Sequence, residues 1–143
     1  MRIVLDTNVL ISSLFKKEST SAQILALWRQ QAVELLISSE GLAEIERVLT
    51  YPKVRKRLVY SDEEVHDFIN LLKCVGTIIR PDFMTPLVGA DPDDDKFVAL
   101  ALTGHAQYLI SGDGHLLDIG RVGDLQIVTP RVFLNWWQTH KTE

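Results

Sequence analysis

Acidic side chains in four separate segments of the 143-residue chain have the types needed for metal-dependent chemistry. Asp6 directly follows the apolar run RIVL, Glu44 lies in SSEGLAEIERVL, the cluster DPDDD occupies 91–95, and Asp113 lies two residues beyond YLIS. Mg²⁺ and Mn²⁺ prefer oxygen ligands, and a bound cation relieves the repulsion between carboxylates in one cleft. Two such ions can activate water and stabilise the leaving oxygen of a phosphodiester. If the fold brings these acids together, they predict nuclease chemistry.

Each acid also has a simpler structural explanation. Asp6 fits the N-cap of a helix, Asp113 fits a turn in SGDG, and the cluster at 91–95 fits a turn followed by a helix start. In the segment that contains Glu44, helical geometry does not exclude Glu40 or Glu46, and most such glutamates face solvent. The joint placement of the acids nevertheless favours a shared site. In addition, the chain has no competing Ser-His-Asp, Cys-His, P-loop or GxGxxG constellation.

Strands and helices that could position these acids alternate along the whole chain. Short apolar runs predict five strands, at 2–5, 33–37, 75–79, 107–110 and 125–128. Capping residues and apolar residues at helical spacing predict helices that start near residues 8, 20, 39, 61, 94 and 130. The proline-containing stretch at 80–90 is predicted to be a loop.

The strand runs are apolar without alternation, which indicates a parallel sheet covered on both faces. We therefore predict one α/β domain over 1–143, with three α/β/α layers and a central, mostly parallel, five-stranded sheet. Ligands of such sheets bind beyond the carboxyl ends of the strands. Right-handed crossovers place Asp6, Asp113 and the start of the helix at 94 on that edge, and Glu44 could reach it from its own helix.

The composition excludes several other classes of protein. The chain is 46% hydrophobic, which is enough for a core, and its formal net charge is −4. It has no apolar window of about 20 residues and no signal peptide, so we expect a cytoplasmic protein with no membrane contact. The single Cys74 excludes an intrachain disulfide, and no Cys/His cluster has the spacing of a zinc site.

The segments VLDTNVLISSLF, SSEGLAEIERVL, DPDDDKFVALAL and YLISGDGHLL, in this order and spacing, resemble the PIN-domain nucleases. The resemblance is particularly to the VapC-like bacterial toxins of toxin–antitoxin pairs, and it extends from Met1 to about Trp137. It implies a PIN-like fold and a metal-dependent endoribonuclease that uses one or two Mg²⁺ or Mn²⁺ ions. It also implies an RNA substrate, a cognate antitoxin as partner and, by analogy with relatives, a homodimer.

The resemblance assigns catalytic and metal-binding roles to four acids of this chain. The first acid of the family falls on Asp6, with Asn8 as its polar companion, and the fourth falls on Asp113. The helix glutamate falls on Glu44, because AEIERVL matches the family better there than at the neighbouring glutamates.

The third acid of the family is assigned to Asp94, because the family places an apolar residue three positions later, as at Phe97, and alanines after it. Asp95 ranks second, since related sequences tolerate Asn at that position. His115 stands where relatives often carry another Asp. The retention of a second ion and the role of this histidine therefore stay open.

Basic residues just after the Glu44 helix could receive the RNA backbone. The segment RVLTYPKVRKR at 47–57 contains five basic residues and no acid. We assign phosphate contacts to Lys53, Arg55, Lys56 and Arg57. Such contacts position a strand without reading its sequence, and a solvated helix turn is the alternative interpretation.

Two other functions remain as alternatives. One is an aspartyl-phosphate phosphatase of the haloacid-dehalogenase type, which also has an Asp after its first strand. That family requires a second Asp two residues later, where this chain has Asn8, and the expected later lysine is not evident. The other is a catalytically degenerate PIN-like binding module with an antitoxin as partner, against which the four retained acids argue.

Overall fold

The computed structural model describes residues 1–80 and 92–140, and within 92–95 it describes only the backbone. The strands are β1 (Arg2–Leu5), β2 (Glu34–Ile37), β3 (Thr77–Ile78), β4 (Tyr108–Ile110), β5 (Arg121–Val122) and β6 (Leu125–Val128). The helices are α1 (Thr7–Ser12), α2 (Thr20–Arg29), α3 (Ser39–Val48), α4 (Pro52–Arg55), α5 (Asp62–Val75), α6 (Pro92–Thr103), α7 (Gly114–Ile119) and α8 (Pro130–His140). Among the described helices, none is long and apolar enough to cross a membrane.

The strands form one sheet in the order β3-β2-β1-β4-β6-β5. All neighbouring pairs are parallel except β5 and β6, which are antiparallel. The predicted α/β fold with a mostly parallel sheet is therefore confirmed. β1 lies between β2 and β4, and Leu5 pairs with Ile110, so β1 and β4 end side by side. The chain beyond these two ends carries Asp6 and Asp113.

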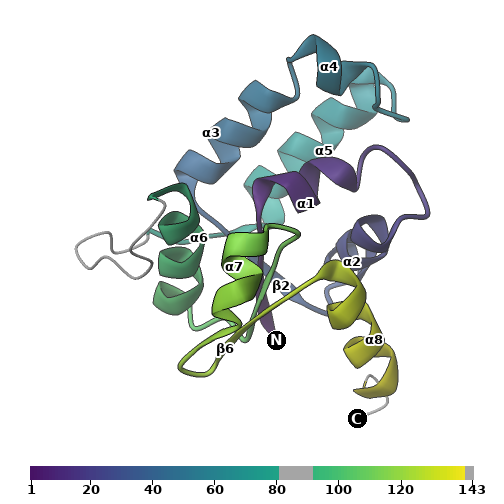
Figure 1. Cartoon of the computed structure of the whole chain (residues 1–143). Coiled ribbons are helices and arrows are strands. Elements are labelled where there is room, and N and C mark those ends of the chain that lie inside the picture. The colour runs from purple at the N-terminus through teal and green to yellow at the C-terminus, as the bar shows by residue number, and fades with distance from the viewer. Residues whose placement is uncertain (81–91, 141–143) are drawn as a thin grey trace.

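Both faces of the sheet are covered by helices (Figure 1). Successive strand residues point to opposite faces, so Ile3 and Leu5 join one buried cluster and Val4 joins the other. The first cluster includes apolar side chains of α1, α2, α3, α5 and α8, whereas the second includes those of α6 and α7. This arrangement explains the continuous apolar runs of the central strands β1, β2 and β4, because neither face of these strands is open to solvent.

Among the described residues the sheet has six strands, so the predicted count of five was wrong by one. β5 pairs with β6 across a hairpin at Gly123, which has a positive φ of 60°. A two-residue strand is too short to leave a period in the sequence. The third strand was predicted to begin at Val75, but α5 continues to that residue and β3 begins at Thr77. α4 and α7 were not predicted as helices, and the loop predicted at 80–90 lies almost entirely outside the described residues.

Several helix starts are confirmed by their caps. The Ser19 hydroxyl accepts the backbone N–H of Ala22 at 3.1 Å, and Ser61 and Glu64 form the predicted capping box of α5. The Thr129 hydroxyl accepts the N–H of Val132 at 3.1 Å at the start of α8. α8 then packs onto the sheet through an aromatic cluster, in which the rings of Phe133 and Trp136 each lie 5.3 Å from Tyr108.

Candidate active site

Asp6 caps a helix and is also a buried acid of the site. It follows β1 and precedes α1, where Oδ1 accepts the backbone N–H of Val9 at 2.8 Å. Its Oδ2 accepts a hydrogen bond from the Ser111 hydroxyl, and the residue is only 5% exposed. Burial raises the pKa of the Asp6 carboxyl above its usual value despite these hydrogen bonds, and the negative charge of Asp113 adds to the increase.

Asp113 reaches the same place from the end of β4. It caps α7 by accepting the backbone N–H of His115 at 3.0 Å. Its own N–H donates to the Ser111 hydroxyl at 2.9 Å. One fully buried serine therefore donates to Asp6 and accepts from Asp113, which links the ends of two neighbouring strands. Ser111 was not among the predicted site residues, although a small polar residue directly after an apolar strand was a usable signal.

Glu44 joins the site from α3 and is held by two partners. The Thr7 hydroxyl donates to Oε1 at 2.6 Å, and the Lys96 ammonium lies 2.5 Å from Oε2. Burial alone would raise the pKa of this carboxyl, but the hydrogen bonds from Lys96 and Thr7 more than offset burial and lower it. The Glu44 and Lys96 side chains are 23% and 24% exposed. Glu44, in the middle of α3, thus connects this helix with the N-terminal parts of α1 and α6.

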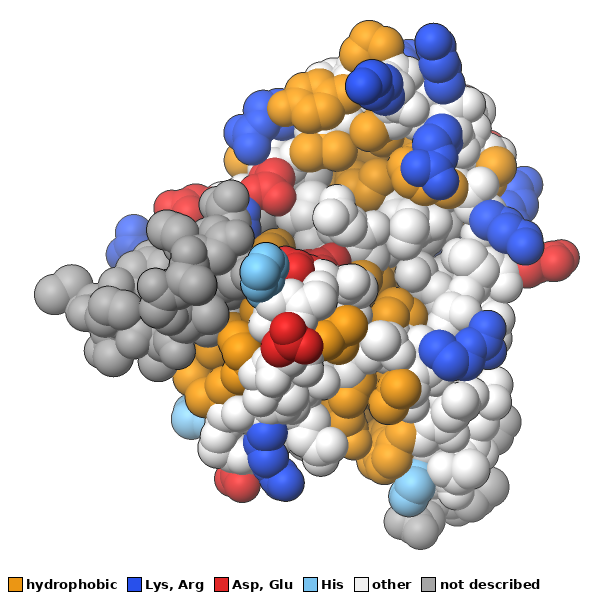
Figure 2. Space-filling view, viewed as in Figure 1, with side chains coloured by type: hydrophobic (Ala, Val, Ile, Leu, Met, Phe, Trp, Pro, Cys, Tyr) orange, Lys and Arg blue, Asp and Glu red, His pale blue; other side chains and the backbone are white. Residues whose placement is uncertain are grey.

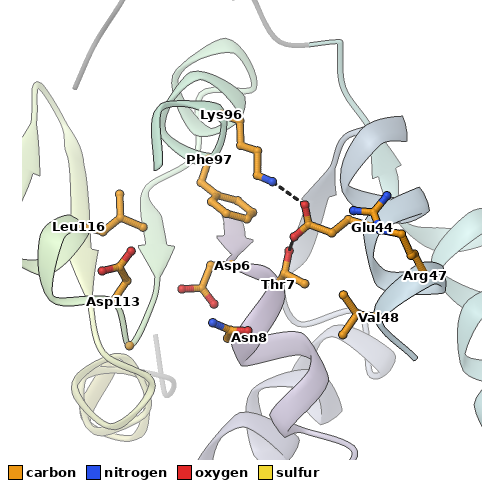
Figure 3. Close-up of a pocket in the computed structure, with 11 residues that line it drawn as sticks. Asp6, Thr7, Asn8, Glu44, Arg47, Val48, Lys96, Phe97, Asp113 and Leu116 are labelled. Atoms are coloured by element: carbon orange, nitrogen blue, oxygen red, sulfur yellow. Dashed lines mark hydrogen bonds and ion pairs between the residues drawn. The ribbon is translucent and has the colours of Figure 1, made fainter. Parts of the chain in front are cut away.

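These side chains surround one cleft of about 690 Å³ (Figure 3). Its lining comes from the ends of β1 and β4 and from α1, α3, α6 and α7. The lining residues are Asp6, Thr7, Asn8, Glu44, Arg47, Val48, Lys96, Phe97, Gly112, Asp113 and Leu116. Three of the four predicted acids and the polar companion Asn8 therefore lie at one cleft.

The third predicted acid cannot be placed as a side chain. Asp94 and Asp95 belong to the first turns of α6, but their side chains lie outside the described residues. Lys96 and Phe97, the next residues of α6, line the cleft. Lys96 was not among the predicted site residues, even though this lysine stands directly after the acidic cluster at 91–95.

The competing glutamates of α3 are placed elsewhere. Glu46 pairs with Lys73 of α5 at 3.2 Å, and Glu40 is exposed and is not part of the cleft lining. His115 is exposed, and its backbone N–H donates a hydrogen bond to the Asp113 carboxylate.

The predicted RNA-contacting residues lie away from the cleft. Lys53 and Arg55 belong to α4, and Lys56 and Arg57 follow it. Figure 2 shows basic side chains at the top of the view, where Figure 1 places α4. Arg55 pairs with Asp62 at 3.1 Å, and the Arg57 guanidinium lies 4.2 Å from the centre of the Phe15 ring. None of the four residues belongs to the described cleft lining.

The described part of the cleft offers an incomplete set of metal ligands. Asp6 and Asp113 supply carboxylate oxygens of the kind that Mg²⁺ and Mn²⁺ prefer, and the burial of Asp6 near a second acid is costly without a cation. Among the described side chains, no group of three or more His, Cys, Asp or Glu residues could hold an ion. A complete site therefore needs a ligand from 92–95, a rearranged Glu44, or both.

Comparisons with known proteins agree with this architecture. The family model described as PIN domain matches residues 2–115. An uncharacterized protein of Methanocaldococcus jannaschii, MJ1680, is 30% identical over 119 residues, which are 83% of this chain and 75% of that protein. A chain in the crystal structure of VapBC2 from Rickettsia felis, bound to a DNA fragment from their promoter, superimposes with a TM-score of 0.54. It is 17% identical and covers 89% of this chain and 97% of its own length, a likeness of fold. The family match spans most of the chain and includes Asp6, Glu44 and Asp113, and the protein therefore belongs to the PIN-domain family.

Proposed function

We propose that this protein is a metal-dependent endoribonuclease of the VapC-like kind. The observation that carries the proposal is the meeting of Asp6 and Asp113 at the ends of two neighbouring parallel strands, with Glu44 lining the same cleft. Members of the PIN-domain family are generally nucleases, which supports hydrolysis of a nucleic acid. RNA as the substrate and a divalent ion as the cofactor are the further content of the proposal.

Asp6, Asp113 and Asp94 are the residues that we propose to hold one or two Mg²⁺ or Mn²⁺ ions, with Glu44 as a further ligand and Asp95 as the substitute for Asp94. When bound, the ion supplies a water of lowered pKa and stabilises negative charge on the leaving oxygen. The hydrogen bonds of Ser111 orient the two aspartates that follow the strands. The capping bonds to Val9 and His115 restrict the same two carboxylates, so their oxygens are fixed before a ligand arrives.

Cleavage of a single-stranded RNA, followed with Mn²⁺, with Mg²⁺ and with chelator, tests the proposal. Asp6→Asn and Asp113→Asn should each remove metal-dependent cleavage while the fold persists. Asp118→Asn is the matched control, because Asp118 lies on α7, is exposed and is not part of the cleft lining. Cleavage that survives in chelator, or that Asp6→Asn leaves unchanged, would contradict the proposal.

A catalytically degenerate PIN-like binding module is the second candidate. It is favoured by one observation, that both oxygens of Glu44 are already bound by Thr7 and Lys96. Calorimetric titration with Mn²⁺ separates the two candidates, because a degenerate module would give no binding heat. An antitoxin partner and a homodimer belong to the proposal as well, and the fold that the chain shares with VapBC2 is what supports the first of them.

A further inference from the structure

The cleft contains two basic side chains beside its acids. Lys96 enters from α6 and Arg47 enters from α3, one turn beyond Glu44. Figure 3 shows both on the Glu44 side of the cleft, with Asp113 on the other side. The cleft is therefore divided into an acidic part at the strand ends and a part where two cations flank one carboxylate. A metal site alone gives no reason for the second part.

Lys96 is held in place with donors to spare. Its ammonium pairs with Glu44 at 2.5 Å and lies 5.2 Å from the centre of the Phe97 ring. An ammonium group has three N–H donors, and the hydrogen bond to Glu44 uses one of them. Since its side chain is 24% exposed, the group is partly dehydrated and already ordered, so binding an anion costs it little further entropy.

Arg47 is the more accessible of the two cations. It is exposed, it lines the cleft, and its positive charge contributes to the lowered pKa of Glu44. Within the described part of the chain, its guanidinium forms no hydrogen bond or salt bridge. A guanidinium presents five N–H donors in a fork that matches two oxygens of a phosphate.

We propose that Lys96 and Arg47 form a phosphate-binding subsite for one backbone phosphate of the RNA strand, on the Glu44 side of the cleft. The inference rests on the proposed function, and it concerns residues outside the basic segment at 53–57. In the described geometry Glu44, which we also propose as a further metal ligand, holds the Lys96 ammonium at the cleft. Thr7 fixes Glu44 in turn through the 2.6 Å hydrogen bond.

Equilibrium binding of a short fluorescein-labelled single-stranded RNA, measured by fluorescence anisotropy in chelator over a range of KCl concentrations, tests the subsite. Lys96→Met and Arg47→Met should each weaken binding by about three- to tenfold. Each should also reduce the slope of log K against log[salt] by about 0.7, the value for one lost phosphate contact on a single strand. Lys96→Arg should retain most of the slope, because it keeps the charge.

Lys73→Met is the matched control. Lys73 lies on α5 and is not part of the cleft lining. It pairs at 3.2 Å with Glu46, which lies on α3 as Arg47 does. This variant should leave both affinity and salt slope unchanged. Thermal unfolding of every variant shows whether the fold persists. If Lys96→Met does not fold, Lys96→Arg and Arg47→Met carry the test, since Arg47 is exposed.

A purely neutralising role of Lys96 gives a different result. If Lys96 only neutralises Glu44, Lys96→Met will tighten Mn²⁺ binding and leave the RNA affinity and its salt slope unchanged, which would overturn the subsite. Failure of the proposed function looks different. In that case the native protein does not cleave RNA with any metal, whereas the loss of salt slope in Lys96→Met and Arg47→Met still appears. Normal cleavage by the native protein with unchanged slopes in both variants refutes the subsite alone.

Discussion

Replacement of Asp6 by Asn removes a buried charge while it keeps most of the surrounding hydrogen bonds. The remaining amide oxygen can still accept the N–H of Val9, which now lies 2.8 Å from Oδ1. The amide nitrogen would face the Ser111 hydroxyl, which has two lone pairs and accepts one N–H, from Asp113. Asp6→Asn should therefore preserve the start of α1 and the link between the two strand ends.

The effect of Asp6 on stability depends on pH in a direction that its environment fixes. Burial, reinforced by the charge of Asp113, raises the pKa of this carboxyl above its value of 3.8 in the unfolded chain. Between these two pKa values the folded protein holds a proton that the unfolded chain has lost, so stability falls as the pH rises through this window. At pH values above this window, the free energy of unfolding stays reduced by the full penalty of the buried Asp6 charge. Glu44 has a lowered pKa and acts oppositely, since its contribution is present above 4.5 and is lost as the pH falls.

Asp6→Asn should therefore be more stable than the native protein at about pH 7 in chelator, and the difference should vanish at low pH, below both pKa values of Asp6. Asp6→Ala loses the helix cap, worth about 1 kcal/mol, and also the hydrogen bond between residue 6 and the buried Ser111 oxygen, worth about 0.5 to 1.5 kcal/mol, which the asparagine amide keeps in the reverse direction. The alanine variant should thus be about 1.5 to 2.5 kcal/mol less stable than the asparagine variant.

Urea denaturation from about pH 3 to pH 8, in chelator and with Mn²⁺, measures these differences. The native protein should gain about 2.7 kcal/mol when Mn²⁺ is at 100 times its Kd, whereas Asp6→Asn should gain much less. A lower stability of Asp6→Asn than of the native protein, near neutral pH in chelator, would refute the claim that the buried Asp6 charge is destabilising. A difference in stability that did not shrink on acidification would refute it as well.

Three further substitutions follow from single contacts. Ser111→Ala removes a hydrogen bond that lowers the pKa of Asp6, so the acid limb of the pH profile of cleavage should move to higher pH; an unmoved limb would contradict the contact. Glu44→Gln breaks the 2.5 Å pair with Lys96 and should cost about 1 to 2 kcal/mol in urea denaturation, more than Glu46→Gln on the exposed side of α3. Gly104→Ala would place a Cβ in steric overlap with the buried Leu36 side chain, so we expect a loss of about 1 to 3 kcal/mol in urea denaturation, and an unchanged midpoint would contradict this expectation.

The sequence predicted those elements of the fold that carry their own signal. The strand at 2–5 is continuous and apolar, and α5 is marked by the capping box at Ser61, so both could be located without a structure. β5 and α7 could not. β5 is two residues long and exists because β6 lies beside it, and α7 has six residues that begin at the Asp113 cap. Short elements of this kind depend on tertiary contacts, which leave no period in the sequence.

The candidate site divides in the same way. Asp6, Glu44 and Asp113 could be named because each stands at a predictable place on a strand end or a helix. The pairing of these acids with their partners could not be predicted, because the contacts join distant segments: Thr7 reaches Glu44 across 37 residues, and Ser111 reaches Asp6 across 105. The first hydrogen bond depends on how α3 packs beside α1, and the second on the pairing of β4 with β1, and neither arrangement is encoded by local sequence.

The structural and functional explanations of the two aspartates do not compete. Asp6 and Asp113 are both helix caps, and each capping bond uses the Oδ1 atom. The cap removes one rotational freedom of the carboxylate, and Ser111 joins the two loops, so the geometry that begins α1 and α7 also fixes two acids at one edge of the sheet. One aspartate can therefore serve both as a helix cap and as a metal ligand. Without the cap, the metal itself would have to order the aspartate side chain. Preorganisation of this kind is what a strand-end site needs to bind a divalent ion, because the ligand then need not supply the ordering free energy.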